Sequence, residues 1–337
     1  MGQELEGGTG HARCEGIDGD SRMAGGMNPR EYSTRSAASR RAPRVAEVMS
    51  EAARLGPDGR GRFLAPASLQ SWPGIVHGGA LAALLDVASR PLAGDEPPRR
   101  IEARLTSSVP LERPLDLQGH ADDSAVTVTI LERGQPLTSA TITTGDEETD
   151  GGALDAGTPP RPRTDPARDA ESWPMPLSDQ CLACGADNPL GLRLGLRFDR
   201  RGVWARFEPR EPWQRPDGRL EPALAAVILD EVAWWLGALV SKEGGLTNRI
   251  SLTLRRPDAA VVGPLLAGGR FDAVTAVDRR RTFWRTHGTL VGADGVVLAT
   301  AAIVFRAGAD YSARQMTFFR SRTDPAVFAR MFPDYAG

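Results

Sequence analysis

The stretch His77-Gly78-Gly79-Ala80-Leu81-Ala82-Ala83-Leu84-Leu85-Asp86 predicts a helix that begins at two glycines and carries a carboxylate about two and a half turns later. Its apolar residues recur at helical spacing, so one face should pack into a core. The first N–H groups of a helix have no partner within the helix. Two glycines leave those groups open to a carbonyl oxygen at the positive end of the helix dipole, which is how backbone can form an oxyanion site.

An altered copy of this stretch occurs 144 residues later in the chain. When Asp86 is aligned with Asp230, Glu221-Pro222-Ala223 falls on His77-Gly78-Gly79. Later strand-like segments also match, and Pro110 falls near Pro257. A repeat of this length predicts two copies of one domain.

The size and charge of the chain limit its class. A length of 337 residues has room for two domains plus tails. The net charge of −2 and the pI of about 6.2 give no general attraction to nucleic acid or to an anionic membrane. The sequence has no run of 18 apolar residues and no signal-type apolar core at its N-terminus, so we expect a soluble cytoplasmic protein. Three cysteines do not make a secreted disulfide framework, which favours reduced thiols.

Composition and periodicity divide the chain into five parts. One helix followed by a series of antiparallel strands, found twice, predicts an α+β protein in which each sheet wraps around a central helix. The predicted parts are a disordered tail at 1–43, a first domain at 44–147, a linker at 148–177, a second domain at 178–309 and a C-terminal tail with a short helix at 310–337.

The expected elements follow from the same patterns. Pro91 should end the first central helix near Arg90, and the aromatic residues of the C-terminal tail should cover core. Helices are expected at 44–55, 77–90, 222–240 and 324–331, and extended segments at 62–71, 101–109, 115–120, 125–131, 137–144, 192–207, 249–254, 265–277, 282–291 and 296–305.

The His-Gly-Gly-(six residues)-Asp pattern of His77 to Asp86 resembles the phenylacetyl-CoA-type branch of the hotdog-fold acyl-CoA thioesterases. Cys181-Leu-Ala-Cys-Gly-Ala-Asp-Asn-Pro-Leu-Gly-Leu192 resembles the opening segment of relatives of that branch. The resemblance covers about 44–147 and 178–309. It implies two hotdog domains in one chain, with their sheets joined side by side and an acyl-CoA thioester bound at the interface.

In this family the helix start of one domain faces the acid of the other. The resemblance therefore implies a site that joins His77, Gly78 and Gly79 to Asp230. A hydroxyl beside the acid is usual about ten residues before the proline that closes the next strand, which implies Thr247. An Asn or Gln is often found six residues before the histidine, and here that position holds Ser71, which the resemblance implies as a substrate-binding residue.

The reciprocal site would join Glu221, Pro222 and Ala223 to Asp86. Proline has no N–H, so Pro222 lacks the donor that Gly78 supplies. Glu221 also brings negative charge to the place where negative charge would develop. Loss of one oxyanion donor costs roughly 2.7–4 kcal/mol, so we expect one of the two sites to be inactive.

In a hydrolysis mechanism, the Gly78 N–H would polarise the thioester carbonyl. Asp230 would act as a general base on water or as a nucleophile through an anhydride, and Thr247 would orient the water or the acid. His77 would shape the helix entrance and contact the thioester. Exposed arginines in turns are often only solvated, but those of two turns are candidates to bind the phosphates of coenzyme A. They are Arg255, Arg256, Arg279, Arg280 and Arg281.

Other interpretations stay open from the sequence. A non-catalytic protein that binds acyl thioesters, or another hotdog reaction such as dehydration, also fits the motifs. Cys181 and Cys184 have no histidine at ligand spacing, so we expect no metal and a loop that packs over the acyl pocket. We expect a small-molecule acyl thioester as the substrate and no cofactor beyond the coenzyme A that it contains. The family resemblance also implies that two such units can pair as a homodimer.

Overall fold

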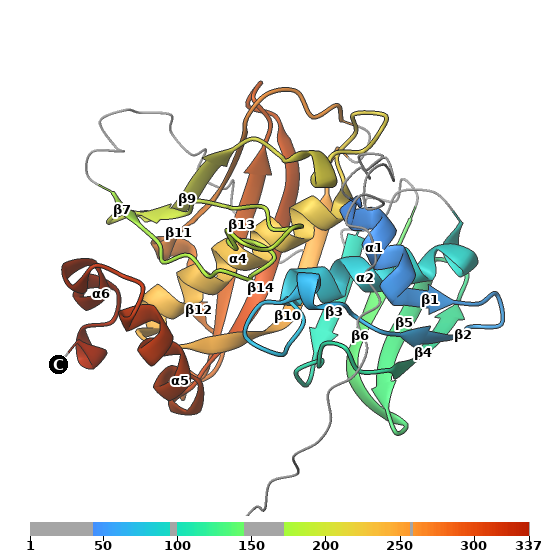
Figure 1. Ribbon diagram of the computed structural model, residues 1–337, viewed down its shortest axis with the longest axis horizontal. Coiled ribbons are helices and arrows are strands. Elements are labelled where there is room, and N and C mark those ends of the chain that lie inside the picture. Colours follow the sequence, from blue (N-terminus) through green and yellow to red (C-terminus); the bar gives the residue numbers. More distant parts are fainter. Residues whose placement is uncertain (1–42, 95–99, 145–171, 257–258, 337) are drawn as a thin grey trace, which may run out of the picture. The chain divides into compact units, whose positions relative to one another are not determined.

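The computed structural model describes residues 43–94, 100–144, 172–256 and 259–336 (Figure 1). The predicted tail at 1–43, except its last residue, and most of the predicted linker at 148–177 lie outside these residues. Within the described residues the strands form one antiparallel sheet of 14 strands in the order β1-β2-β4-β5-β6-β3-β10-β14-β13-β11-β9-β8-β7, with β12 paired to β13. This large antiparallel sheet with few helices agrees with the α+β prediction.

The N-terminal half of the sheet carries helix α2, which packs against β3, β4, β5 and β6. The elements of this half are α1 (Val45–Ala52), β1 (Ala53–Leu55), β2 (Arg60–Phe63), η1 (Ala67–Leu69), α2 (Gly78–Ala93), β3 (Arg100–Leu105), β4 (Leu115–Ala121), β5 (Ala125–Glu132) and β6 (Gln135–Thr143).

The C-terminal half carries helix α4, which packs against β9, β10, β11, β13 and β14. Its elements are β7 (Trp173–Pro174), β8 (Arg197–Phe198), β9 (Gly202–Phe207), η2 (Glu211–Trp213), α4 (Pro222–Ser241), β10 (Gly245–Leu254), β11 (Leu265–Arg270), η3 (Phe271–Ala273), β12 (Thr275–Ala276), β13 (Phe283–Val291), β14 (Val297–Ala307), α5 (Ala309–Arg320), α6 (Pro325–Met331) and η4 (Pro333–Tyr335).

Alternating side chains explain why the strands bury one face. In β5, Val126, Val128 and Ile130 are buried, whereas Thr127 and Thr129 between them are partly exposed. The turn into β6 uses Arg133 and Gly134 at positive φ, 51° and 79°, as a tight hairpin between twisted strands requires.

The two halves join through strands and through helices. β3 pairs with β10 in antiparallel register, with Ile101 opposite Leu252. α2 packs against α4 at Gly79, where a Cβ atom would lie only 2.4 Å from the carbonyl oxygen of Ala226. This close approach brings the first turn of α2 against the middle of α4.

Helix α4 is apolar around most of its circumference because it is enclosed. By length and composition it could also cross a membrane, but 83% of its most apolar 18-residue window is buried within the fold. Trp235 and Leu236 are among its fully enclosed side chains. Such burial is what a core helix requires.

Several elements differ from the sequence predictions. Helix α2 passes through Pro91 and ends at Ala93, with Gly94 as its C-cap at a φ of 83°. A proline in the last turn removes a single backbone bond. The predicted helix at 44–55 ends at Ala52, and β1 follows it. Residues 192–196 form no strand, and the 310–337 tail holds α5 as well as the expected α6.

Helix α5 was not predicted because its stability comes from distant contacts. Ser312 and Gln315 accept hydrogen bonds from the backbone N–H groups of Gly244 and Gly245, each at 2.8 Å. In Figure 1, α5 and α6 lie beside the C-terminal end of α4. Phe319 of α5 contacts Trp235 there, with ring centroids 4.9 Å apart.

Candidate functional site

A cavity lies where the first turn of α2 meets α4. Both halves of the chain line it, and so do the Cys181–Cys184 loop and α5. The residues with polar or reactive groups in its wall include Ser71, His77, Thr106, Cys181, Cys184, Asp230, Glu231, Thr247, Asn248 and Arg306.

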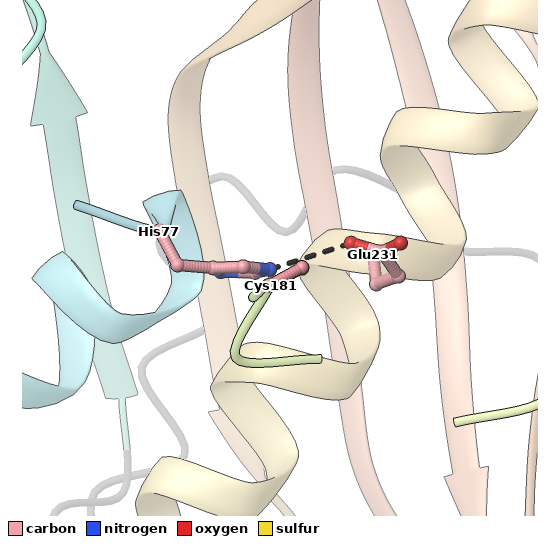
Figure 2. A group of neighbouring side chains, drawn as sticks. All are labelled: His77, Cys181 and Glu231. Atoms are coloured by element: carbon pink, nitrogen blue, oxygen red, sulfur yellow. Dashed lines mark hydrogen bonds and ion pairs between the residues drawn. The ribbon is translucent and has the colours of Figure 1, made fainter. Parts of the chain in front are cut away.

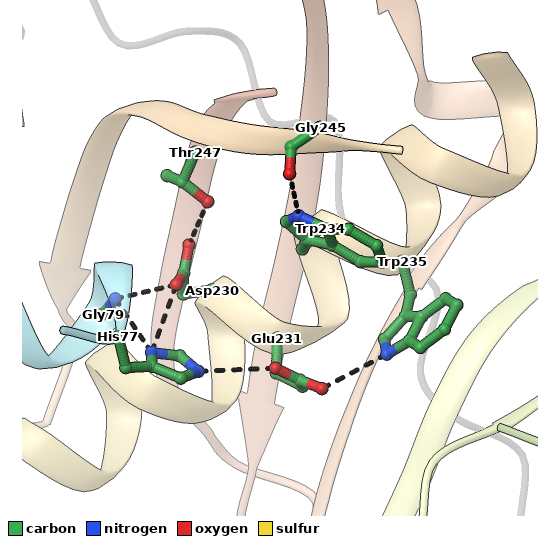
Figure 3. A network of polar contacts seen from close by, with 8 residues as sticks. All are labelled: His77, Gly79, Asp230, Glu231, Trp234, Trp235, Gly245 and Thr247. Carbon is green, nitrogen blue, oxygen red and sulfur yellow. Dashed lines mark hydrogen bonds and ion pairs between the residues drawn. The ribbon is translucent and has the colours of Figure 1, made fainter. Parts of the chain in front are cut away.

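Asp230 is the central acid of this cavity (Figure 3). Its Oδ2 accepts a hydrogen bond from the Gly79 N–H at 2.7 Å, and its Oδ1 accepts one from the Thr247 hydroxyl at 2.7 Å. The side chain is buried, and burial raises the pKa of Asp230, although the charge of His77 and these hydrogen bonds oppose that rise. A carboxylate with a raised pKa is a stronger base.

Thr247 reaches Asp230 because β10 is irregular at this point. Thr247 pairs with Phe305 of β14 and Arg249 pairs with Val304, the next residue of that strand. Asn248 therefore has no partner in β14 and forms a β-bulge. A bulge of this kind redirects side chains beside functional sites. Asn248 itself donates a hydrogen bond to the Leu105 carbonyl across the junction at 3.2 Å.

Gly78 begins α2 and faces the same acid. A Cβ at Gly78 would lie 2.7 Å from Oδ2 of Asp230 and 3.3 Å from Cβ of Thr247. Within the described residues the Gly78 N–H makes no hydrogen bond, whereas the Gly79 N–H is engaged by Asp230. Of the two amides suggested by the sequence, Gly78 therefore supplies the free donor.

His77 is the N-cap of α2 and is almost fully buried, with 2% of its surface exposed. Its Nδ1 lies 3.2 Å from the Gly79 nitrogen and 3.4 Å from Oδ2 of Asp230, and its Nε2 lies 3.3 Å from Oε2 of Glu231. Burial alone would lower the pKa of His77, but Cys181, Glu231 and Asp230 together raise it well above its ordinary value.

Glu231 and Cys181 are site residues that sequence reasoning missed. Glu231 follows Asp230 on α4, and its Oε1 accepts a hydrogen bond from the Trp235 indole at 3.2 Å (Figure 3). Cys181 contacts His77 from a different segment (Figure 2). The adjacent acids Asp230 and Glu231 were a signal in the sequence, whereas the approach of Cys181 to His77 depends on the path of a loop.

The loop that carries Cys181 lines the cavity and is tied to the other half of the chain. The Leu182 N–H donates to the Gln70 carbonyl at 2.7 Å, and the Asn188 side chain donates to the Ser68 carbonyl at 2.8 Å. Asn188 is fully buried, so its part is to hold this loop.

The reciprocal arrangement around Asp86 is also assembled. Glu221 is the N-cap of α4, and Pro222 is its first residue, as the 144-residue offset predicts. Burial raises the pKa of Asp86 to about 7, and the charge of Glu221 adds to the rise while Arg90 opposes it. Arg100 stands ten residues before Pro110, as Thr247 stands ten residues before Pro257, but it is not a hydroxyl residue and it bonds Glu102. No donor equivalent to Gly78 exists here, because Pro222 lacks an N–H.

The predicted substrate-binding residues divide into two groups. Ser71 lines the cavity. The five predicted arginines are exposed and do not line it: Arg255, Arg256, Arg279, Arg280 and Arg281. Arg281 instead lies 4.9 Å from the ring of Trp284. The cavity has another arginine, Arg306 of β14, which sequence reasoning did not select.

Aromatic rings form the apolar part of the cavity wall. Trp72 packs against Trp234, Phe318 and Phe319 with centroid distances of 5.3 to 6.0 Å. We expected the tail phenylalanines only to cover core. Phe328 does so, but Phe318 and Phe319 also line the cavity.

Comparisons with known proteins agree with this architecture. No family model matches the sequence, and no curated protein matches it. A candidate thioesterase II from Thermobifida fusca YX has a TM-score of 0.56 at 15% identity, over 79% of this chain and 98% of that one. A candidate thioesterase from Novosphingobium aromaticivorans DSM 12444 has a TM-score of 0.51 at 22% identity, over 77% and 99%. A protein of unknown function with a hotdog fold from Alicyclobacillus acidocaldarius has a TM-score of 0.50 at 16% identity, over 77% and 98%.

This chain has the hotdog fold. Because hotdog folds host several chemistries, its function has to be argued from the site. In this hotdog protein, a free helix N–H, a buried acid and a hydroxyl meet in one cavity.

Proposed function

We propose that the chain is a double hotdog thioesterase that hydrolyses an acyl-CoA, or an acyl group on a carrier, at the junction of its two halves. The observation that carries the proposal is the approach of Asp230, in the second copy of the repeat, to Gly78 and Gly79, in the first copy. The strand order supports two side-by-side hotdog domains, since β3 of one copy pairs with β10 of the other.

The chemistry begins with polarisation of the thioester carbonyl by the Gly78 N–H. The carbonyl oxygen lies at the N-terminus of α2, where the helix dipole also stabilises the developing oxyanion. Asp230 takes a proton from a water molecule, and that water attacks the carbonyl carbon. The C–S bond then breaks, the proton moves to the leaving thiolate, and a carboxylic acid and a thiol remain. In the alternative mechanism, the Asp230 carboxylate attacks the carbonyl carbon, the C–S bond breaks and the thiolate leaves. Water then hydrolyses the resulting anhydride, which restores Asp230, and the proton released goes to the thiolate.

Contacts with neighbouring residues orient the Asp230 carboxylate for this reaction. Thr247 holds Oδ1 through its hydroxyl, and Gly79 holds Oδ2 through its backbone N–H. His77 caps α2 with its Nδ1 beside Gly79 and Asp230. These contacts fix the carboxylate in one orientation within the cavity.

Only one of the two composite sites should work. The Asp86 site has Pro222 in place of an N–H donor and Glu221 as a buried acid beside the expected oxyanion position. Both changes oppose stabilisation of negative charge. We assign hydrolysis to the Asp230 site.

The substrate is a small-molecule acyl thioester, with its acyl group against the aromatic wall and Arg306 as the cation of the cavity rim. The proposal needs neither a cofactor beyond the coenzyme A of the substrate nor a nucleic acid or membrane partner. We further propose a cytoplasmic location, pairing of two such units, and contacts from Arg255, Arg256, Arg279 or Arg281 to the phosphates of coenzyme A outside the cavity.

The test is hydrolysis of a panel of acyl-CoAs by the purified chain, followed through thiol release. The wild type should exceed Asp230→Asn by at least a hundredfold on its best substrate, while Asp86→Asn should keep most of the activity. Circular dichroism should confirm that both variants fold. Equal rates for wild type and Asp230→Asn across the panel would overturn the proposal.

A non-catalytic acyl-thioester-binding protein is the second candidate. It is favoured by the engagement of both Asp230 carboxylate oxygens by protein donors, which leaves neither free of a hydrogen bond. Titration calorimetry separates the two functions: tight binding of acyl-CoA by the wild type without turnover would support the binding protein.

A further inference from the structure

Three potential metal ligands converge at the edge of the cavity. The ligand atoms of His77, Cys181 and Glu231 all lie within 4.8 Å of one another. They come from the N-cap of α2, from the Cys181–Cys184 loop and from α4, and Figure 2 shows the three side chains pointing toward one another. The fold therefore brings together three potential ligands whose spacing in the sequence gave no sign of a metal site.

We propose that His77 Nε2, Cys181 Sγ and Glu231 bind one Zn²⁺ ion, with the fourth ligand position open to the cavity. Nitrogen, thiolate and carboxylate oxygen are the three ligand types that zinc takes in proteins, and three protein ligands with one open position is the form of a reactive zinc site.

The distance between two of the ligands fits the ion. Zn–N and Zn–O bonds of about 2.0–2.2 Å at a tetrahedral angle place the nitrogen and oxygen about 3.3 Å apart. His77 Nε2 and Glu231 Oε2 are 3.3 Å apart. This contact is long for a charged hydrogen bond, which is usually 2.7–2.9 Å.

Charge also favours a cation at this position. A Cys181 thiolate and the Glu231 carboxylate would be two negative charges beside the single imidazole of His77, and buried charge that is not fully paired is costly. The Glu231 side chain is only 13% exposed, and Cys181 is buried. A divalent ion neutralises both groups, and its binding displaces the proton that His77 Nε2 shares with Glu231.

Each of the three ligands already has an outer partner. His77 Nδ1 lies 3.4 Å from Oδ2 of Asp230, the carboxylate–histidine–metal arrangement that orients a ligating imidazole. The Trp235 indole donates to the other oxygen of Glu231. Cys184 forms a hydrogen bond with Cys181.

The test is metal binding by the reduced full-length chain after removal of metal with a chelator. Cys14→Ser removes a thiol outside the described residues and serves as the background. We expect one Co²⁺ per chain with thiolate-to-cobalt absorption, displaced by one Zn²⁺. Cys181→Ser and Glu231→Gln should each weaken Zn²⁺ binding at least tenfold, and Asp86→Asn should not change it.

A second measurement needs no variant in the cluster. Zn²⁺ should protect Cys181 from alkylation by iodoacetamide, as read by mass spectrometry of its peptide. Equal alkylation with and without Zn²⁺, no thiolate-to-cobalt absorption, or unchanged binding in folded Cys181→Ser would each overturn the proposal. None of these readouts depends on hydrolysis, so a failed thioesterase assay leaves the metal result intact, and the reverse also holds.

Discussion

The backbone N–H of Gly79 lies 2.7 Å from Oδ2 of Asp230, although the two residues are 151 positions apart in the chain. This contact joins the start of α2 to the middle of α4, so it ties the packing of the two helices to the position of the acid. A substitution at Gly79 should therefore test how tightly the two helices pack.

Gly79→Ala should reduce the free energy of unfolding by about 2 kcal/mol or more, as overpacking of a tight contact does. The new methyl would lie 2.4 Å from the Ala226 carbonyl oxygen and 2.7 Å from Cα of Val227, which belong to helix backbone and cannot move aside. Chemical denaturation measures the change. The control is Gly195→Ala, where the added methyl group would have no atom within 4 Å. Gly134→Ala is less suitable, because the φ of Gly134 is 79° and alanine would be strained there.

Thr247→Val should lower kcat/KM roughly tenfold to hundredfold, since a hydrogen bond to a charged group contributes about 1.5–3 kcal/mol. The change removes the hydroxyl that holds Oδ1 of Asp230 and keeps the shape of the side chain. Thr247→Ser retains the hydroxyl and should keep most of the activity. Equal losses in the two variants would show that the hydroxyl is not what matters.

Asp86 should make stability depend on pH. Its pKa is raised to about 7 by burial, so the folded state holds a proton that the unfolded state releases near pH 4. The folded state binds more protons in that window, and the free energy of unfolding should fall as pH rises from about 4 to 7, by on the order of 4 kcal/mol. Asp86→Asn should flatten this dependence in denaturation curves. A wild-type slope that persists in Asp86→Asn would assign it to other groups.

Phe318→Ala should raise KM for acyl-CoAs with aromatic or long acyl groups by roughly threefold to tenfold, the value of one aromatic contact. Phe318 lines the cavity and packs edge-on against Trp72. The KM for acetyl-CoA should not change, because a short acyl group does not reach this wall. Steady-state kinetics with both substrates checks the difference.

Much of the fold could be predicted from local pattern. The repeat correctly placed the starts of α2 and α4 at Gly78 and Pro222, because helix starts depend on residues close in sequence. The family resemblance, and not the repeat, implied which acid faces which helix start. Helix α5 could not be predicted, since the backbone partners of Ser312 and Gln315 lie 68 and 70 positions earlier in the chain.

Part of the site was predictable from the family resemblance, which implies a fixed arrangement of a helix start, an acid and a hydroxyl. Gly78, Asp230 and Thr247 meet as expected. The neighbourhood of Cys181 and Glu231 was not foreseen, because a loop can cross a helix start along many paths that leave no periodic signal. Arg306 was not selected either, because the charge of a residue in a sequence does not reveal which strand end faces a cavity.

The most direct test of the central claim is a crystal structure with a non-hydrolysable acyl-CoA analogue. The account predicts density for the analogue in the cavity, with its carbonyl oxygen within hydrogen-bonding distance of the Gly78 N–H and its carbonyl carbon beside Asp230. Density at Asp86 and Glu221, or at a surface away from both acids, would contradict it.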